Sequence, residues 1–466
     1  MKFVRYGVFV FVGLTLFLGI FGFTGADRAE AEEKEAKVIE WKGKVALDKT
    51  FTVAEGERLV ILPGAEVAIK QGEKVAIRVL GALEVRGDKG RAVRLHPEGD
   101  VAPGAWTGIV LEGSGESVIR HAALEGASSG LSLANASVYV SDSTFENCRQ
   151  GVEVNQKALA RLENCTFRKN LVGVVANLSG RVELVGSRFD TVREIGVVVQ
   201  NGGSGRLEKC ELRGGKRGLF ALTNAPVEVV SSTFSSFEQG AVFRQVGKNS
   251  LVKRCTFENN VTGILSVQFS FEKISDCTFK NNKSAIDIRE FSSPHVTHCD
   301  IVGNQLGINL FRKSNSLIDF NVLLNNRTGI MINFSSYPGI FSNNFERNDM
   351  HVKLGEFQSG DWEKRAGSKN ISGREAARRG SRNIGAFKGE RSYPRRVNAK
   401  GNFWGTDLGD FESSEVNLEK IWDGNDFGPV TYEGYGDEKY TIDRVDFSEW
   451  KREPVKEAGT REEAGR

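Results

Sequence analysis

Methionine and histidine are scarce in this chain of 466 residues, which has 3 Met and 5 His. Copper and related soft-metal sites draw on methionine, histidine and cysteine ligands, so a site built from many such side chains is disfavoured. The nearest cluster is HVTHC, from His295 to Cys299. The strand register described below turns Val296 and Cys299 inward and both histidines outward. His295 and His298 therefore do not converge, and we expect no metal and no cofactor.

Strong net charge is also missing, since the formal value is only +3. The net charge therefore creates no electrostatic field that would attract a polyanionic partner. We also expect no nucleic-acid partner, because the N-terminal segment described next predicts export.

Only one long apolar run exists, Tyr6–Phe23, with Lys2 and Arg5 before it and small residues after it. This layout predicts a secretory signal peptide over residues 1–31. The alternative is an uncleaved anchor, which would be the only contact with a membrane, because 18 residues can just span a bilayer. No cysteine follows the run, so a lipoprotein anchor is not supported. Either way we expect export to the periplasm or the cell surface.

What the chain does contain is a repeat. Each repeat contains a residue, usually glycine, that we call the anchor. Apolar residues follow it at every second position, as in GVEV and GIMI, and the anchors recur every 21 to 23 residues. A period held over eleven intervals predicts a solenoid, and alternation with β-branched residues predicts strands. Glycine at the anchor suits a sharp corner before the strand. The anchors are Gly108, Gly130, Gly151, Gly173, Gly196, Gly218, Gly240, Gly263, Ala285, Gly307, Gly329 and His351.

Equivalent residues form columns when strands stack about 4.8 Å apart. One inward column is small: Ser143, Cys165, Ser187, Cys210, Ser232, Cys255, Cys277, Cys299, Asn321 and Asn343. Two residues further on, a second is large: Phe145, Phe167, Phe189, Leu212, Phe234, Phe257, Phe279, Ile301, Leu323 and Phe345. A third, three residues before the next anchor, is often asparagine: Asn170, Asn260, Asn282, Asn304, Asn326 and Asn348.

These columns predict an all-β fold, a single-stranded right-handed parallel β-helix with coils of about 22 residues and capped ends. The cysteines share their columns with serine and asparagine, so we expect small buried thiols rather than disulfide bridges. Residues 38–107 form the N-terminal cap and irregular first coils, and 108–354 the regular coils. Residues 355–400 are a basic loop insertion and 401–450 a closing segment. The charged tail 451–466 has few apolar residues and is expected to be disordered.

Four motifs add a resemblance to known proteins. They are LVILPGAEVAI at 59–69, GAWTGIVL at 104–111, the 22-residue coils, and GNFWGT at 401–406 followed by EKIWDGNDFGPVTYEGY. The chain resembles secreted β-helix proteins of the pectin-lyase-like superfamily, and within it the NosD-like group, over about 38–440. The resemblance implies the fold. It leaves the function open, because the superfamily holds lyases, hydrolases, epimerases and binding proteins, and NosD-like proteins are associated with periplasmic copper handling.

The catalytic patterns of that superfamily are missing. The chain has no Asp-Asp and no His-Gly dipeptide, whereas its hydrolases carry aspartate pairs with a His-Gly. The nearest substitute is AIDIRE, with Asp287, Arg289 and Glu290 at a strand end, which we interpret as a solvated strand end. No catalytic residue is predicted.

The candidate binding face is an outward column two residues past the anchors. Five consecutive apolar residues there, which we call the apolar stripe, predict a partner surface. The alternative is that the C-terminal aromatics, among them Trp404, Trp422 and Tyr435, cover the stripe. The apolar stripe consists of Val175, Val198, Phe220, Val242 and Leu265.

A basic segment, residues 363–400, is a second candidate surface, either solvated or able to hold an acidic ligand. Three functions remain. The first is an exported non-catalytic scaffold or binding protein that contacts a polysaccharide or an envelope protein. The second is a polysaccharide lyase or hydrolase, and the third a NosD-like accessory factor for metal-centre assembly.

Overall fold

The computed structural model describes residues 37–113, 115–367, 394–406, 417–434 and 436–461, all within one compact unit. The expected signal peptide and most of the basic segment lie outside the described residues. Within the described ranges, no helix is both long and apolar enough to cross a membrane.

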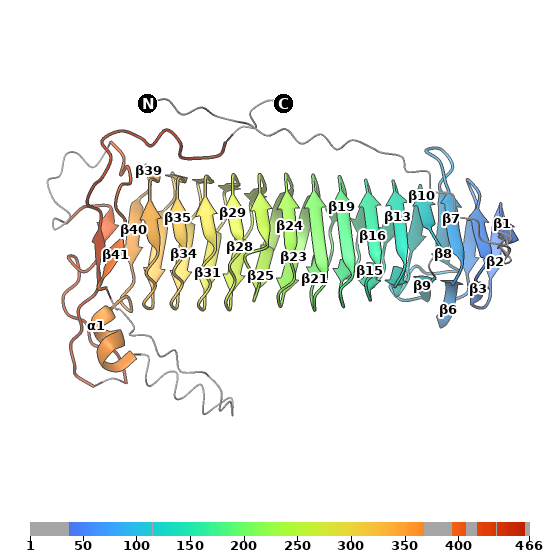
Figure 1. Ribbon diagram of the computed structural model, residues 1–466, viewed down its shortest axis with the longest axis horizontal. Helices are drawn as coiled ribbons and strands as arrows, with labels where there is room; N and C mark the ends of the chain where they lie inside the picture. The colour runs from blue at the N-terminus through green and yellow to red at the C-terminus, as the bar shows by residue number, and fades with distance from the viewer. Residues whose placement is uncertain (1–36, 114, 368–393, 407–416, 435, 462–466) are drawn as a thin grey trace, which may run out of the picture. The chain divides into compact units, whose positions relative to one another are not determined.

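The chain winds as a right-handed parallel β-helix of about 14 coils, as the repeat predicts (Figure 1). Each coil places strands in three columns in turn, and each strand pairs in parallel with its equivalent in the next coil. Two long strands, β23 (Glu211–Leu222) and β25 (Thr233–Arg244), run through both the second and the third column.

Column 1 is the 16-stranded sheet. Its strands are β1 (Lys37–Trp41), β4 (Glu57–Ile61), β7 (Ala82–Arg86), β10 (Ser117–Arg120), β13 (Ser137–Ser141), β16 (Leu159–Glu163), β19 (Arg181–Val185), β22 (Ser204–Glu208), β24 (Val227–Val230), β26 (Leu251–Lys253), β29 (Lys273–Ser275), β32 (His295–Thr297), β35 (Leu317–Asp319), β38 (Gly339–Phe341), β41 (Arg396–Asn398) and β43 (Arg444–Asp446).

Columns 2 and 3 together form the 27-stranded sheet, joined through β23 and β25. Column 2 also contains β2 (Lys44–Leu47), β5 (Glu66–Ile69), β8 (Val93–Pro97), β11 (Ala122–Glu125), β14 (Thr144–Glu146), β17 (Thr166–Arg168), β20 (Arg188–Asp190), β27 (Thr256–Glu258), β30 (Thr278–Lys280), β33 (Asp300–Val302), β36 (Val322–Leu324) and β39 (Asn344–Glu346). Column 3 also contains β3 (Phe51–Val53), β6 (Gly72–Val79), β9 (Trp106–Leu111), β12 (Ser129–Ala134), β15 (Gln150–Asn155), β18 (Val172–Ala176), β21 (Ile195–Val199), β28 (Thr262–Val267), β31 (Ser284–Arg289), β34 (Leu306–Phe311), β37 (Thr328–Asn333), β40 (Met350–Leu354) and β42 (Ile421–Trp422).

The core confirms the predicted register. Phe257 and Phe279 pair directly and stack with ring centroids 5.0 Å apart and planes 8° from parallel. Both are fully buried. Full burial of a phenylalanine contributes roughly 1.5–3 kcal/mol, so this column is a main source of stability.

Glycine is needed at the anchors for a reason other than the sharp corner that the sequence suggested. At Gly151 an added Cβ would lie 2.6 Å from the carbonyl oxygen of Gly173 and 2.8 Å from the Phe167 ring. Close packing against the next coil and the aromatic column therefore requires glycine there, not a left-handed turn.

Two asparagine ladders satisfy the buried polar groups of the turns. The Asn282 side-chain amide donates to Asn304 Oδ1 at 3.0 Å, and Asn304 Oδ1 also accepts from the Asn282 backbone N–H at 2.8 Å. The second ladder continues the small inward column, since Asn321 donates to Asn343 and Asn343 to Asn402, both at 2.9 Å. Every rung of such a ladder supplies the hydrogen bonds that burial would otherwise remove.

All six cysteines are buried free thiols, as predicted. Burial raises the pKa of the Cys148 and Cys165 thiols to about 12.

The C-terminal motif GNFWGT adds a further coil where a cap was expected. Asn402 extends the small column, and the Trp404 ring stacks on Phe345 at 4.6 Å. β41 and β43 pair over them, so residues 396–398 of the predicted loop are a strand. The rest of the described loop includes α1 (Gly360–Trp362) and a π-helical turn at Glu363–Gly367.

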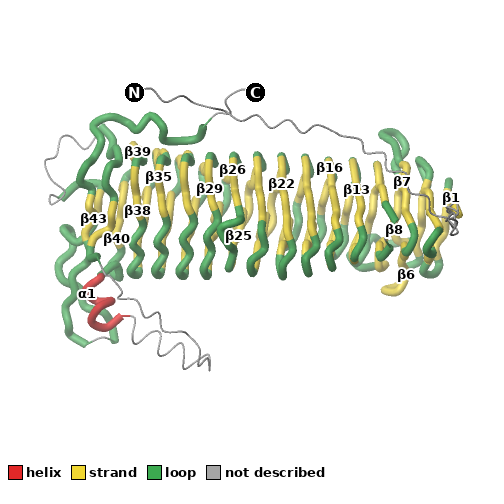
Figure 2. Tube along the Cα trace, in the orientation of Figure 1, coloured by secondary structure: helices red, strands yellow, loops and turns green. Residues whose placement is uncertain are grey.

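The predicted disorder of the charged tail is wrong for residues 451–461. This segment, which we call the C-terminal strap, lies along the edge of the coils near β35 and β39 (Figure 2). Asn344 exchanges two hydrogen bonds with the Val455 backbone, at 2.8 and 3.0 Å, and the Gly459 N–H donates to Phe320 O. Arg461 then pairs with Asp276 at 2.7 Å. Backbone hydrogen bonds and ion pairs hold the strap, which is why its lack of apolar residues was misleading.

Candidate functional site

The apolar stripe lies on the outer side of column 3. Its members pair one above another across β18, β21, β23, β25 and β28, while the residues that alternate with them belong to the core. They are less exposed than expected, because neighbours about 4.8 Å apart shield one another. Val175 and Val198 are 7% exposed and Val242 is 4% exposed. Phe220 is partly exposed, with the Arg217 guanidinium 5.1 Å from its ring centroid.

Polar, apolar and charged residues flank the apolar stripe. Gln239 and Thr262 lie in the outward position before the strand anchors, and Asn177 and Gln200 lie just after the stripe; these four are partly exposed. The same positions in the other coils of the stripe hold Val172, Ile195, Arg217, Leu222, Arg244 and Val267. An amide offers two N–H donors and a carbonyl acceptor, so this face combines aliphatic surface with hydrogen-bonding groups of both kinds.

The C-terminal aromatics are packed elsewhere in the part of the chain that the structure describes. Trp404 is in the core, and Trp422 contacts Phe427 with centroids 5.6 Å apart. Tyr432 and Tyr440 form a separate cluster with Trp362 at the end of the stack that carries α1 (Figure 1). Tyr435 lies outside the described residues.

Asp287 lies at one end of the stripe, one coil beyond Leu265. It is 5% exposed and is held by neighbours on two coils. Arg289 donates to both oxygens, with Nε at 2.9 Å from each, and the Asn309 amide donates to Oδ1 at 2.8 Å. The solvated strand end that the sequence indicated is thus a buried carboxylate in a paired network. The hydrogen bonds that Arg289 makes to Asp287 raise the pKa of the guanidinium.

The two histidines of HVTHC point outward, as the register predicts, and have separate partners. His295 Nε2 lies 2.9 Å from Asp319 Oδ1, and the His298 ring stacks on Phe320 at 5.1 Å. Burial lowers the pKa of His298. Burial pushes the pKa of Asp319 upward, but hydrogen bonds from His295 and Thr297 hold it below its usual value.

Two family models match the sequence. "Right handed beta helix region" matches residues 172–323, and "Periplasmic copper-binding protein (NosD)" matches residues 95–221. Neither match reaches half of the chain; together they support a right-handed β-helix that is similar to the NosD group.

Among curated proteins, none matches the sequence. Solved structures similar to this NosD-like chain include two modules from Azotobacter vinelandii. The mannuronan C-5 epimerase AlgE4 A-module is 15% identical, with 63% of this chain and 89% of that chain covered and a TM-score of 0.28. The AlgE6 A-module is 12% identical, with 64% and 87% covered and a TM-score of 0.38. A mutant of the periplasmic alginate epimerase AlgG is 12% identical, with 68% and 82% covered and a TM-score of 0.37. At these scores none of them carries a functional inference.

The copper that the NosD family name prints does not fit the residues present. The described residues contain no group of three or more His, Cys, Asp or Glu that could hold a metal ion. The six thiols are buried in the core, and the histidines of HVTHC are engaged separately. We therefore derive no chemistry through a metal.

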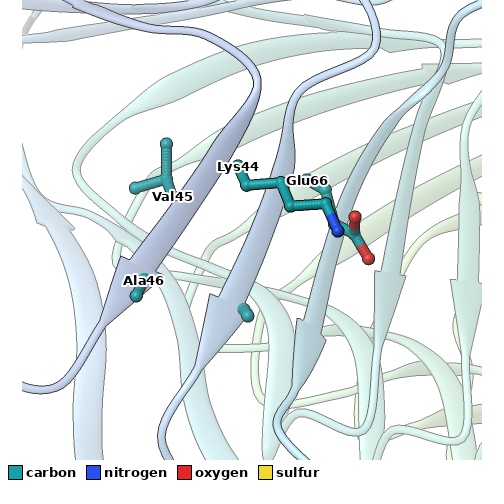
Figure 3. Close-up of a pocket in the computed structure, with 5 residues that line it drawn as sticks. Lys44, Val45, Ala46 and Glu66 are labelled. Carbon is teal, nitrogen blue, oxygen red and sulfur yellow. The ribbon is translucent and has the colours of Figure 1, made fainter.

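Two shallow hollows lie on the surface of this NosD-like solenoid. The first, about 310 Å³, is lined by Lys44, Val45, Ala46, Glu66 and Ala68 on β2 and β5. Figure 3 shows the Lys44 side chain lying across the neighbouring strand toward Glu66, whose Oε1 is 3.2 Å from His96 Nε2. Its groups do not converge on an enclosed space. The second hollow, near Phe269, is considered below.

A buried acid was missed by the sequence analysis. Glu272 is 0% exposed, inside the solenoid where the adjoining coil has Ser250. The Ser266 hydroxyl donates to Glu272 Oε1, and Oε2 has no hydrogen-bond partner among the described residues. Burial raises the pKa of Glu272 to about 7. The only available signal was one acidic residue at a position that small residues, valine and proline occupy in the other coils.

Proposed function

We propose that this protein is an exported, non-catalytic β-helix scaffold that binds a polysaccharide strand along the outer face of column 3. The N-terminal segment and the family name "Periplasmic copper-binding protein (NosD)" support export to the periplasm or the cell surface. The observation that carries the binding role is the apolar stripe, in which Phe220 and Leu265 are partly exposed, together with the amides and the hydroxyl of Asn177, Gln200, Gln239 and Thr262 beside it.

The chemistry of this face suits sugars. A sugar ring has an apolar C–H side and hydroxyl groups around its rim. The aliphatic stripe offers contact to the first, and the flanking amides and hydroxyls offer donors and acceptors to the second. The repeat of the face from coil to coil suits a ligand that itself repeats.

The positions of the carboxylates support a role without catalysis. Two carboxylates stand at the ends of the stripe, in the same outward column of the described strands. Glu153 is one coil before Val175, and Asp287 is one coil after Leu265. Six coil spacings separate them, about 29 Å, whereas the two carboxyl groups of a glycosidase lie roughly 5–9.5 Å apart. Asp287 is also occupied by Arg289 and Asn309.

Affinity electrophoresis tests the binding role, with alginate, polygalacturonate, mannan or glucan cast in native gels. We expect one of these polymers to retard the wild type and Val198→Lys to remove the retardation, because a charged side chain interrupts the stripe. Val230→Lys is the matched control. Val230 is 8% exposed and points outward from column 1, next to Lys253 and Glu208.

The same polymers, incubated with the protein and analysed for new chain ends, test for cleavage. Release of oligosaccharides would overturn the non-catalytic role and favour a lyase or hydrolase. If no polymer retards the wild type, polysaccharide binding is wrong and an envelope protein is the partner to seek.

A further inference from the structure

In the coil of β25 the left-handed corner between column 3 and column 1 has one residue instead of two, and we call this corner the short turn. The whole connection is one residue longer than in the neighbouring coils, because Gly247, Lys248 and Asn249 lie between Val246 and Ser250. In most coils two successive residues there adopt the left-handed conformation, whereas Gln245 does so alone. The two-residue turns are Gln156–Lys157, Leu178–Ser179, Asn201–Gly202, Thr223–Asn224, Gln268–Phe269, Glu290–Phe291, Arg312–Lys313 and Phe334–Ser335.

The hydrogen bonds show where the residue is missing. The Gln245 N–H donates to Val267 O at 3.3 Å, and the Val246 N–H donates to Ser270 Oγ at 3.3 Å. Gln245 is thus the only residue of the β25 coil opposite Gln268 and Phe269 of the next coil. In the full turns each of the two residues has its own partner, as in Thr223 to Arg244 and Asn224 to Gln245.

The short turn uncovers one face of the Phe269 ring. The other face stacks on Phe291, with centroids 5.2 Å apart and planes 9° from parallel, and Phe269 is 53% exposed. Its open side faces a hollow of about 390 Å³, a volume within the range of ligand pockets. We call this hollow the Phe269 notch.

The notch is one layer thick. Asn224, on its far side, is two coils from Phe269, or about 9.6 Å along the stack, so a single flat ring fills the layer between them. Thr223 and Gln245 complete the walls, and none of the residues that line the notch is charged. The side-chain amides of Asn224 and Gln245 belong to exposed residues and are open to solvent.

The turn at Asn135 is a useful contrast. It also has a single left-handed residue, but the next coil there continues with Gln156 and Lys157. Lys157 stands there in place of an aromatic residue, and its flexible side chain offers no flat surface for a ring to stack on. The short turn and the phenylalanine are both needed to make a notch.

We propose that the Phe269 notch binds one neutral pyranose ring, with its C–H face against Phe269 and its hydroxyls bonded to Asn224, Gln245 and Thr223. This inference rests on the proposed polysaccharide binding and names one subsite for it. The notch begins where β25 and β28 end, so a strand lying on the apolar stripe reaches it at the edge of the same face. Uncharged walls favour a neutral sugar over a uronic acid, whose carboxylate would lose water without gaining a cation.

The test uses the full-length protein and defined sugars. Saturation-transfer NMR with maltose, cellobiose and mannobiose, and with galacturonic acid as the charged probe, should show contact with a neutral disaccharide alone. Phe269→Ala should weaken that binding about tenfold or more, which is the loss of one good contact. Phe291→Ala is the matched control, because Phe291 is 42% exposed in the next coil and lies outside the notch.

Inserting one asparagine after Gln245 restores the left-handed pair at this corner and should close the notch. Circular dichroism checks that the coils remain, and binding should be lost with the fold intact. Equal binding by the wild type, Phe269→Ala and the insertion variant would overturn the proposal. So would tighter binding of galacturonic acid than of any neutral sugar.

The stripe variant separates this inference from the proposed function. Val198→Lys should abolish retardation by the polymer and leave disaccharide binding unchanged, because Val198 lies on the strand face, one coil away from Thr223 and Asn224 in the turn. If the polymer is bound but disaccharides are not, the notch proposal fails alone. If disaccharides bind and no polymer does, the polysaccharide scaffold fails and the notch stands.

Discussion

Replacing Glu272 by glutamine should change how stability depends on pH. Glu272 is fully buried, and its pKa is raised from the usual 4.5 to about 7 by burial, against the Ser266 hydrogen bond, which lowers it. Between pH 4.5 and about 7 the folded protein therefore holds a proton that the unfolded chain releases. The free energy of unfolding falls as pH rises through this window and is insensitive to Glu272 below and above it.

The size of the effect follows from the same two values. One pKa unit corresponds to about 1.4 kcal/mol, so the wild type loses roughly 3 kcal/mol between pH 4 and pH 8 on account of Glu272. Glutamine has a similar shape and cannot ionise. Whatever fixed cost its amide carries, the stability difference between Glu272→Gln and the wild type should shift in favour of the variant by about 3 kcal/mol across that range.

Urea unfolding at pH 4, 6 and 8, followed by circular dichroism, measures the difference. Ser266→Ala is the second variant. It removes the hydrogen bond that favours the carboxylate, so the fall in stability should extend to higher pH than in the wild type. A difference between Glu272→Gln and the wild type that stays constant from pH 4 to pH 8 would refute this reasoning.

Three further outcomes are expected. Phe257→Ala should lower the free energy of unfolding by roughly 3–5 kcal/mol, because it leaves a cavity in the aromatic column. Lys280→Ala, at an exposed position in the adjoining coil, should lower it by less than about 1 kcal/mol. Equal losses in urea unfolding would contradict the register. Arg461→Ala should cost about 1–3 kcal/mol, because Asp276 stays buried without its cation, and a larger cost at pH 7 than at pH 3 in thermal melts is the diagnostic sign. The native cysteines should not react with a thiol reagent at pH 8 until urea unfolds the protein, and prompt labelling of the folded protein would contradict their burial.

The column register could be predicted from the sequence because every coil repeats the same inward residues. Phe257 above Phe279, and the asparagines above one another, follow from a period that neighbouring coils share. The outward position of Val175 follows from the same alternation, but its 7% exposure does not, because shielding depends on how closely the neighbouring side chains pack.

The features that were missed depend on departures from the repeat. The Phe269 notch results from a corner with one left-handed residue instead of two, and the extra residues at Gly247–Asn249 hide this in an anchor spacing of 23. Glu272 is a single charged exception at a position that small and apolar residues occupy in the other coils. The C-terminal strap contacts coils far from it in sequence, as Arg461 and Asp276 are 185 residues apart, and a local pattern holds no information on such a pair.

The C-terminal strap also changes how the solenoid comes apart. In a linear array each coil touches only its neighbours, so coils at an open end can fray singly. The strap is fixed to four successive coils, at Asn344, Phe320, Asp300 and Asp276. These coils must open as one cooperative block or release the strap first. Since the residues of the strap follow every coil in the chain, its contacts form only after the coils beneath it have been synthesised.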